Sequence, residues 1–220
     1  MKVSNKIFLV IPAFNEEKHI KNVVTDAARY CANIVVVDDG SSDNTKRIIE
    51  SLPVTSVYLP TNVGKGRALK FGVELAISKG ADKIITIDAD GQHNIKHLPK
   101  FIKALDDYEV AIGVRYGHHP IPFVRKLGNR TASLLVAILY QIYVKDLLCG
   151  FRGFRREVYP KIKWQSSRYG IETEMIARIG KNRLKYTEIQ IENIYIDQFK
   201  GVTLLDAIEV FLSIPKFKFN

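Results

Sequence analysis

The sequence is poor in cysteine and lacks a metal-binding cysteine pattern. Only two of the 220 residues are cysteines, Cys31 and Cys149, and they lie far apart in the chain. This excludes a disulfide-rich secreted scaffold and a zinc site built on paired cysteines. We therefore expect two reduced thiols and a cytoplasmic setting.

The sequence also has no hydrophobic run long enough to cross a membrane. The longest run, Leu134 to Val144, is interrupted by Gln141, whereas a spanning helix needs about 20 residues. The first apolar run, Ile7 to Ile11, ends at Pro12 and is too short for the core of a signal peptide. We expect a protein that is soluble or binds the cytoplasmic face of a membrane peripherally.

Acidic residues are in the minority. Lysine and arginine number 33 against 23 aspartates and glutamates, which gives a net charge of +10 and a pI near 9.5. Such a surplus predicts an anionic partner: nucleic acid, a lipid-phosphate surface or a phosphorylated substrate. The length suits one domain with a short appendage. We assign residues 1–202 to the domain and residues 203–220 to an amphipathic tail whose Lys/Phe end suits a membrane interface.

Apolar runs alternate with helical patterns along the chain. Runs rich in β-branched residues predict buried strands at residues 7–11, 34–37, 55–59, 84–87 and 110–114, and in the second half a short strand within 146–154 and an outer strand at 185–196. Predicted helices include residues 15–30, 95–105, 123–143 and 171–180. This alternation predicts an α/β fold with a doubly wound, mostly parallel sheet, whose ligands bind beyond the carboxyl ends of its strands.

Polar side chains follow the predicted strands at that edge. The stretch Asp88-Ala89-Asp90-Gly91-Gln92-His93 follows the strand at 84–87, and Asp38-Asp39 follows an earlier strand. Two carboxylates two residues apart, with the Gln92 amide, form a hard oxygen site that suits Mg²⁺ or Mn²⁺ carrying phosphate oxygens. A lone Asp-x-Asp is equally compatible with a solvated acidic turn. Acids at consecutive strand ends favour the metal site, because core packing does not require them.

Several common nucleotide and nucleic-acid motifs are absent. Gly64-Lys65-Gly66 lacks both the earlier glycine and the following serine or threonine of a P-loop. No Gly-x-Gly-x-x-Gly follows the first strand, which argues against a dinucleotide-binding fold. The arginines cluster after the Asp-x-Asp instead of forming a stripe, and we expect no nucleic-acid partner.

Four motifs together carry a family likeness. Their order along the chain is typical of the family 2 glycosyltransferases, which have the Rossmann-like GT-A fold. The four motifs are residues 10–17 (VIPAFNEE), 37–41 (VDDGS), 62–66 (NVGKG) and 88–93 (DADGQH). The chain resembles that family over roughly residues 6–200. Within that family, the second half of the chain is similar to the polyprenyl-phosphate (dolichyl-phosphate) sugar synthases. The residues that carry this similarity are Arg115 after Gly113-Val114, Arg125 with Arg130, and Gly150-Phe151-Arg152 after Asp146.

The resemblance implies a nucleotide-sugar donor, linked to GDP or UDP, and a divalent metal. A Mg²⁺ or Mn²⁺ ion held by Asp90, with Asp88 and Gln92, would neutralise the leaving diphosphate by Lewis-acid action. The positions that match the family's donor site are Pro12, Ala13, Asn15, Glu16, Asp38, Asp39, Lys65, Asp88 and Ala89.

The resemblance also implies a polyprenyl phosphate acceptor for the transferred hexose. Its oxygen is already ionised at neutral pH, so it needs cationic clamping instead of a general base. The expected clamp consists of Arg115, Arg125 and Arg130, with Arg152 behind them. A single direct displacement would invert the anomeric carbon.

The chain departs from that branch, and an alternative stays open. Members often end with Arg-x-x-Gly-x-Ser-Lys, but residues 197–204 here lack the arginine and the second basic residue. Trp164 does not belong to the Gln-x-x-Arg-Trp motif of processive synthases. The main alternative is a family 2 enzyme that glycosylates a sugar hydroxyl in glycan or polysaccharide synthesis. It would need a carboxylate base, for which Asp146, Glu172 and Glu174 are the candidates.

Overall fold

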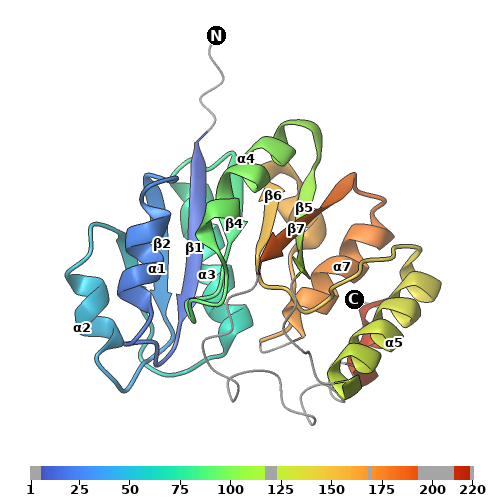
Figure 1. Cartoon of the computed structure of the whole chain (residues 1–220), viewed down its shortest axis with the longest axis horizontal. Coiled ribbons are helices and arrows are strands. Elements are labelled where there is room, and N and C mark those ends of the chain that lie inside the picture. The colour runs from blue at the N-terminus through green and yellow to red at the C-terminus, as the bar shows by residue number, and fades with distance from the viewer. Residues whose placement is uncertain (1–5, 117–122, 168–169, 193–210, 219–220) are drawn as a thin grey trace.

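The computed structural model describes residues 6–116, 123–167, 170–192 and 211–218, with only the backbone described for residues 123–129 and 218. Its centre is a seven-stranded sheet in the order β3-β2-β1-β4-β6-β5-β7 (Figure 1). The strands are β1 (Ile7–Ala13), β2 (Asn33–Asp38), β3 (Thr55–Tyr58), β4 (Lys83–Thr86), β5 (Val110–Tyr116), β6 (Arg152–Arg155) and β7 (Tyr186–Glu192).

The predicted doubly wound, mostly parallel sheet is confirmed. β1 pairs in parallel with β2 and β4, β2 with β3, and β5 with β7. β6 is the exception, because it lies between β4 and β5 and is antiparallel to both. The short strand expected within residues 146–154 is therefore a central strand, and its first residue, Arg152, pairs with Thr86 at the end of β4.

The continuous apolar runs have a direct structural cause: helices cover both faces of the sheet. Along β1, Phe8 and Val10 enter one core cluster, whereas Leu9 and Ile11 enter the other. The first cluster lies under α3 (Lys65–Ser78), α5 (Phe123–Tyr140), α6 (Tyr159–Ile162) and α7 (Ile171–Lys181); the second lies under α1 (Ile20–Ala27), α2 (Thr45–Glu50) and α4 (Leu98–Asp107). A strand buried on both faces has no polar side to alternate with.

Three expected helices have different bounds. The first was expected from Asn15, but α1 begins at Ile20 because side chains of the segment after β2 accept the backbone N–H groups of Asn15, Glu16 and Glu17. The helix at 95–105 begins as a 3-10 turn, η1 (Ile95–His97), and continues as α4. α5 ends at Tyr140 instead of residue 143, because Gln141 adopts a positive φ of 56°.

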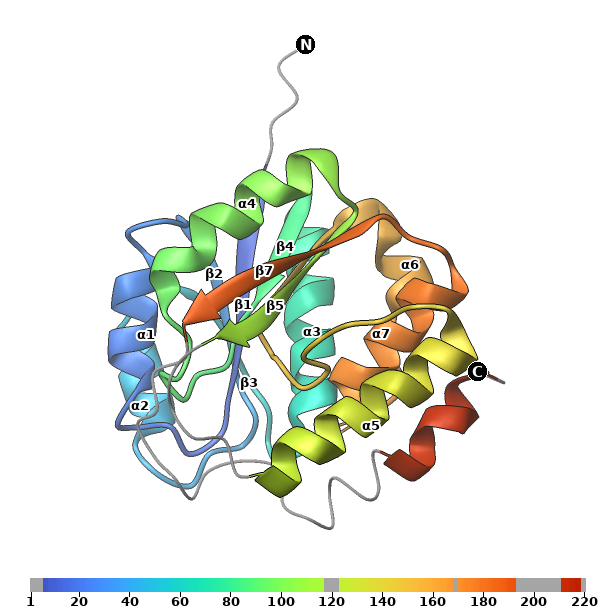
Figure 2. The ribbon, with the colours of Figure 1, turned by 45° about the vertical axis from the view of Figure 1, so that its right-hand side comes forward.

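The described end of the chain packs on the domain. The last turn, η3 (Ile214–Lys218), lies beside α5 and α7 (Figure 2), and Ile214 and Phe217 are buried in the first core cluster. The Tyr140 hydroxyl donates a hydrogen bond to the Ile214 carbonyl. Most of the predicted tail helix lies outside the described residues, so the division at residue 202 stays a prediction. Another short 3-10 turn, η2 (Arg156–Val158), precedes α6.

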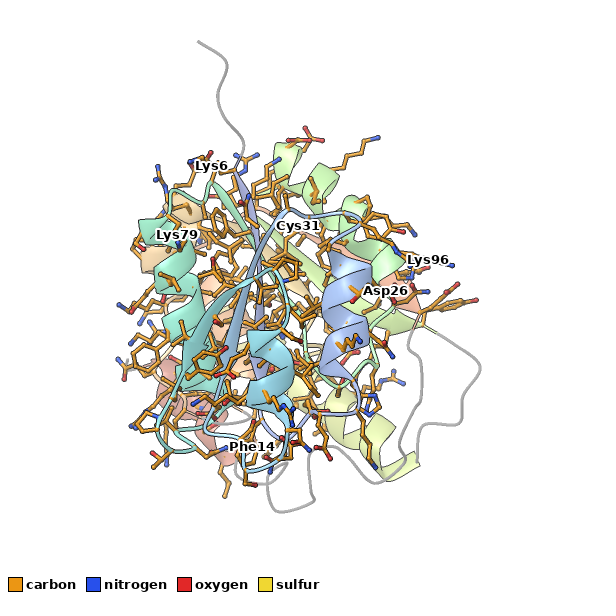
Figure 3. The ribbon with its side chains drawn as sticks, turned by 90° about the vertical axis from the view of Figure 1, so that its left-hand side faces the viewer. Lys6, Phe14, Asp26, Cys31, Lys79 and Lys96 are labelled. Atoms are coloured by element: carbon orange, nitrogen blue, oxygen red, sulfur yellow. The ribbon has the colours of Figure 1, made fainter. Side chains whose placement is uncertain are left out.

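The carboxyl ends of β1, β2 and β4 meet at one edge of the molecule (Figure 1). Figure 3 marks the two ends of β1, with Lys6 at one end of the molecule and Phe14 at the other. The polar motifs that follow these three strands are thereby brought together, as the alternation of strands and helices predicted.

Candidate active site

The Asp-x-Asp motif lies in the turn that leaves β4. Ile87 still pairs with β1 through a hydrogen bond from its N–H to the Val10 carbonyl. Gly91 then takes a positive φ of 73°, and the Gln92 N–H donates to Asp90 Oδ1 at 3.0 Å. A left-handed glycine lets the chain turn back within two residues. The turn therefore presents Asp88 and Asp90 at the carboxyl edge.

Asp88 is already paired with a cation of the chain. Lys65 Nζ, at the start of α3, lies 2.6 Å from Asp88 Oδ1 and 2.7 Å from Glu172 Oε1. His93 Nε2 lies 3.5 Å from Asp88 Oδ2. Burial alone would raise the pKa of Asp88, but the Lys65 ammonium lowers it well below its usual range. The same pairs raise the pKa of Lys65 although burial opposes this, so the lysine stays charged.

Asp90 is in a different electrostatic position. Burial and the neighbouring Asp88 charge raise the pKa of Asp90. Within the described part of the chain Asp90 forms no ion pair, and its one hydrogen bond there comes from the Gln92 N–H. A carboxylate of this kind is stabilised by an added cation, so the residues fit a divalent metal.

No cluster of three or more His, Cys, Asp or Glu side chains in residues 6–116, 123–167, 170–192 and 211–218 is arranged to hold a metal ion by itself. This agrees with the coordination habits of Mg²⁺, which usually binds one or two carboxylates together with waters and phosphate oxygens. A metal here would depend on a bound diphosphate for part of its coordination.

The loop after β1 is tied to the loop after β2. Asn15 takes a positive φ of 54°, and its side-chain Oδ1 accepts the Ser42 N–H at 2.8 Å. The Asn15 N–H donates to Ser41 Oγ at 2.9 Å, and the Ser41 hydroxyl in turn donates to Asp38. Two predicted donor-site residues, Asn15 and Asp38, thus lie in one small network at the carboxyl edge. The N–H of the neighbouring Glu16 donates separately to Thr45 Oγ1 at 2.7 Å.

Asp39 is a buried clamp between β2 and α3. Its two carboxylate oxygens accept the N–H groups of Val63 and Gly64 at 2.8 and 2.9 Å. Burial raises the pKa of Asp39 in spite of these bonds. Its own N–H donates to the carbonyl of Ala13, the last residue of β1. The predicted donor residue therefore fixes the loop that leads to Lys65.

Two further predicted residues lie at the inner side of the edge. Pro12 is buried near the end of β1 and lines a small cavity together with Lys65, Asp88 and Glu172. Ala89 is buried between the two aspartates. Neither side chain carries a polar atom, so both shape the site instead of binding through side-chain hydrogen bonds.

The predicted acceptor arginines are not equivalent in the structure. Arg115 in β5 forms a two-pronged pair with Asp146, with Nε 2.6 Å from Oδ2 and Nη2 2.9 Å from Oδ1. Burial opposes ionisation, but this pair lowers the pKa of Asp146. Arg130 lies exposed on α5, and the side chain of Arg125 lies outside the described part. Much of the Arg115 fork is therefore engaged within the protein.

Arg152 has an internal role that its sequence position did not reveal. Its side chain is buried and donates to the carbonyl oxygens of Cys149, Glu172 and Leu147 at 2.9, 2.6 and 2.7 Å. It joins the segment before β6 to the first turn of α7. We expected it to lie behind the phosphate clamp, and the structure instead shows it holding backbone.

The three candidate bases are also engaged. Asp146 pairs with Arg115, Glu172 with Lys65, and Glu174 with Arg178, and the side chains of the three carboxylates are at most 8% exposed. Glu174 also accepts hydrogen bonds from the N–H groups of residues 165 and 166. Their sequence positions gave no indication of these partners, because each partner except Arg178 comes from a distant segment.

Both cysteines are buried and free. Burial raises the pKa of the Cys149 thiol to about 12, and it raises that of Cys31 as well. The thiols are therefore protonated at neutral pH and unreactive.

Comparisons with known proteins bear on this site. Residues 8–163 match the family described as "Glycosyl transferase family 2". The UDP-N-acetylglucosamine–dolichyl-phosphate N-acetylglucosaminyltransferase of Methanococcus voltae is 31% identical over 240 residues, covering 96% of each chain. The polyprenol monophosphomannose synthase of Mycolicibacterium smegmatis is 26% identical over 207 residues, covering 87% of this chain and 78% of that protein.

Among solved structures, glucosyl-3-phosphoglycerate synthase from Mycobacterium tuberculosis has the same fold. Its complex with Mn²⁺, UDP and glucosyl-3-phosphoglycerate aligns with a TM-score of 0.75 at 19% identity, covering 99% of this chain and 80% of that chain. The similarity covers the sheet and the elements that carry the site described above.

Proposed function

Because the chain belongs to glycosyl transferase family 2 and has the GT-A fold, we propose that it transfers a hexose or N-acetylhexosamine from a GDP- or UDP-linked donor to a polyprenyl phosphate. The relatives named above support this acceptor, since one acts on dolichyl phosphate and the other is a polyprenol monophosphomannose synthase. The family supports the transfer reaction itself.

In the proposed reaction, Asp90 would hold Mg²⁺ or Mn²⁺ with Asp88 and Gln92. The bound ion would supply positive charge to the diphosphate that leaves the sugar. The structural relative from Mycobacterium tuberculosis binds Mn²⁺ together with UDP. The nucleoside part of the donor would lie at the same edge, beside Asn15, Glu16, Asp38 and Asp39. Lys65 would contribute a second, permanent positive charge beside Asp88.

The observation that favours a phosphate acceptor over a sugar hydroxyl is the state of the three candidate bases. Asp146, Glu172 and Glu174 are each buried in an ion pair and cannot take a proton from a hydroxyl without breaking that pair. A phosphate oxygen needs no such base. Direct attack on the sugar would then invert its anomeric carbon.

Arg125 and Arg130 on α5 are the proposed clamp for the acceptor phosphate. Arg130→Ala or Arg125→Ala should reduce the use of polyprenyl phosphate about ten- to a hundredfold, the cost of one charge-assisted contact of about 1.5–3 kcal/mol. Binding of the nucleotide sugar should change little. Lysine should restore activity only partly, because it lacks the planar fork.

The assay is transfer of radiolabelled sugar into an organic-extractable product, with polyprenyl phosphate compared with free polyprenol and simple sugars. Arg29→Ala serves as a control, since that side chain is exposed just after α1 and, within the described residues, pairs with Asp26. Transfer to a sugar hydroxyl, without a preference for the phosphate and without loss in the α5 variants, would establish the alternative acceptor.

We also propose that the protein binds the membrane surface peripherally. Within the described residues no helix is both long and apolar enough to span a bilayer. Leu134 and Ile138 are exposed on α5, Ile138 at 78%, and Phe211 and Leu212 are exposed at the described chain end beside it. Together with the net charge of +10, such a surface suits anionic lipid.

Vesicle sedimentation tests this association. The wild type should bind vesicles that contain anionic lipid at low salt and be released at high salt, because surface attraction is screened. Ile138→Glu should weaken binding, whereas Phe71→Glu, on α3, should not. An absence of vesicle binding at low salt would refute the proposal.

A further inference from the structure

A partly buried lysine joins two distant parts of the candidate site. Lys65 Nζ contacts Asp88 Oδ1 at 2.6 Å and Glu172 Oε1 at 2.7 Å, and Glu172 lies 107 positions away from Lys65 in the chain. A lysine has a long flexible stem, so one carboxylate alone leaves its ammonium several accessible positions. Two carboxylates that both contact the ammonium restrict it to one place.

The backbone around this pair is fixed as well. The Gly66 N–H donates to the Ser167 carbonyl at 2.8 Å, and the buried Trp164 indole donates to the Gly66 carbonyl at 2.7 Å. A Cβ at Gly66 would lie 2.2 Å from the Ser166 carbonyl oxygen, so only glycine permits this approach. The start of α3 is thereby held against the segment that leads into α7.

The two carboxylates are held in place too. A Cβ at Gly150 would lie 2.4 Å from Asp88 Oδ2, which shows how closely the segment before β6 confines Asp88. Arg152 donates to the Glu172 carbonyl at 2.6 Å and so fixes the first turn of α7. The Lys65 ammonium is the single ionic link between these two fixed groups in the part of the chain described.

We infer that Glu172 is a positioning residue for the Asp-x-Asp motif: it holds Lys65 against Asp88 and so sets the place of Asp88 and of a positive charge beside the donor diphosphate. The inference rests on the proposed function, to which it assigns an additional residue. It gives Glu172 a different role from that of a base, since its carboxylate acts through Lys65 and not on the acceptor.

The test is a double-mutant cycle with Glu172→Gln, Lys65→Met and the double variant. Each is measured for urea unfolding, for Mn²⁺-dependent UDP binding, and for kcat and KM of sugar transfer. Glu172→Gln should weaken Mn²⁺-dependent UDP binding or lower transfer about ten- to a hundredfold, the usual effect of removing a supporting contact. In the Lys65→Met background the same change should have little further effect, because the two residues act as a unit.

Glu157→Gln is the matched control, since Glu157 is exposed and pairs with Arg155 away from the site. If Glu172→Gln does not fold, Glu172→Asp is used instead. It keeps the negative charge but shortens the side chain by one methylene, so it should also weaken Mn²⁺-dependent UDP binding. Additive effects, or a variant that loses stability while UDP binding and kinetics stay at wild-type values, would overturn the inference. If the wild type transferred no sugar, the proposed function would be refuted. The double-mutant cycle measured by Mn²⁺-dependent UDP binding would still decide the role of Glu172.

Discussion

Replacing Asp90 by asparagine should separate the stability of the fold from its activity. The Asp90 carboxylate has one hydrogen bond from Gln92 N–H and no ion pair within the described residues, and burial and Asp88 raise its pKa. The raised pKa is the net result of these contacts, so the folded protein disfavours the ionised form. Asparagine keeps the shape and an oxygen acceptor while removing the charge.

Two opposite effects follow from this change. In metal-free buffer at pH 7 the Asp90→Asn variant should be more stable than the wild type, because the cost of the buried charge is removed. In a chain of this size the melting temperature should rise by about 2–4 °C for each kcal/mol gained in the free energy of unfolding. Transfer should fall by at least about 10²–10³-fold, the usual effect of losing one group that stabilises developing charge. Stability and function thus change in opposite directions.

The sign of the pH dependence follows from the same shift. Because the folded pKa of Asp90 is raised, the cost of its charge is present at neutral pH and disappears as the pH falls through that pKa. The stability difference between variant and wild type should therefore shrink as the pH approaches about 4.

Thermal unfolding with and without MnCl₂ and UDP measures both effects. Ligand at 100 times its dissociation constant stabilises a protein by about 2.7 kcal/mol, so the wild type should gain a clear shift and the variant should lose most of it. Asp107→Asn, at an exposed carboxylate on α4, is the control. A variant with the full Mn²⁺–UDP shift and wild-type transfer would refute the assignment of Asp90.

Two more substitutions test the surroundings of the site. Gly150→Ala places a Cβ 2.4 Å from Asp88 Oδ2; it should displace that carboxylate, cost about 1–3 kcal/mol of stability and lower transfer about 100-fold, and wild-type kinetics would contradict this. Asp146→Asn breaks the pair with Arg115 and should cost about 3 kcal/mol in urea unfolding. Because the folded pKa of Asp146 is lowered, the ionised carboxylate stabilises the fold above pH about 4, and this stabilisation is lost as the pH falls further. If the variant and the wild type lost equal stability on acidification, this role of Asp146 would be refuted.

Much of the architecture could be predicted from local patterns. The runs rich in β-branched residues marked the parallel strands, because a strand covered on both faces is apolar throughout. The alternation of strands and helices then placed Asn15, Asp38 and Asp88 at one edge, since parallel strands end on the same side. The motifs in these loops indicated the family, and the match over residues 8–163 confirmed it.

Other features depended on contacts that no local pattern records. β6 lies antiparallel between β4 and β5, although its sequence resembles a short strand of either direction. α1 begins five residues later than expected because Ser41, Asp43 and Thr45 accept the N–H groups that would have opened it.

The roles of the charged residues were likewise decided by the tertiary structure. From sequence, Glu172 was a candidate base and Arg152 a candidate phosphate contact; in the fold, one holds Lys65 and the other holds backbone carbonyls. A residue's type and spacing show which chemistry it can perform. Whether it is free to do so depends on the partner that the fold places beside it, and for Lys65 and Glu172 that partner lies 107 positions away.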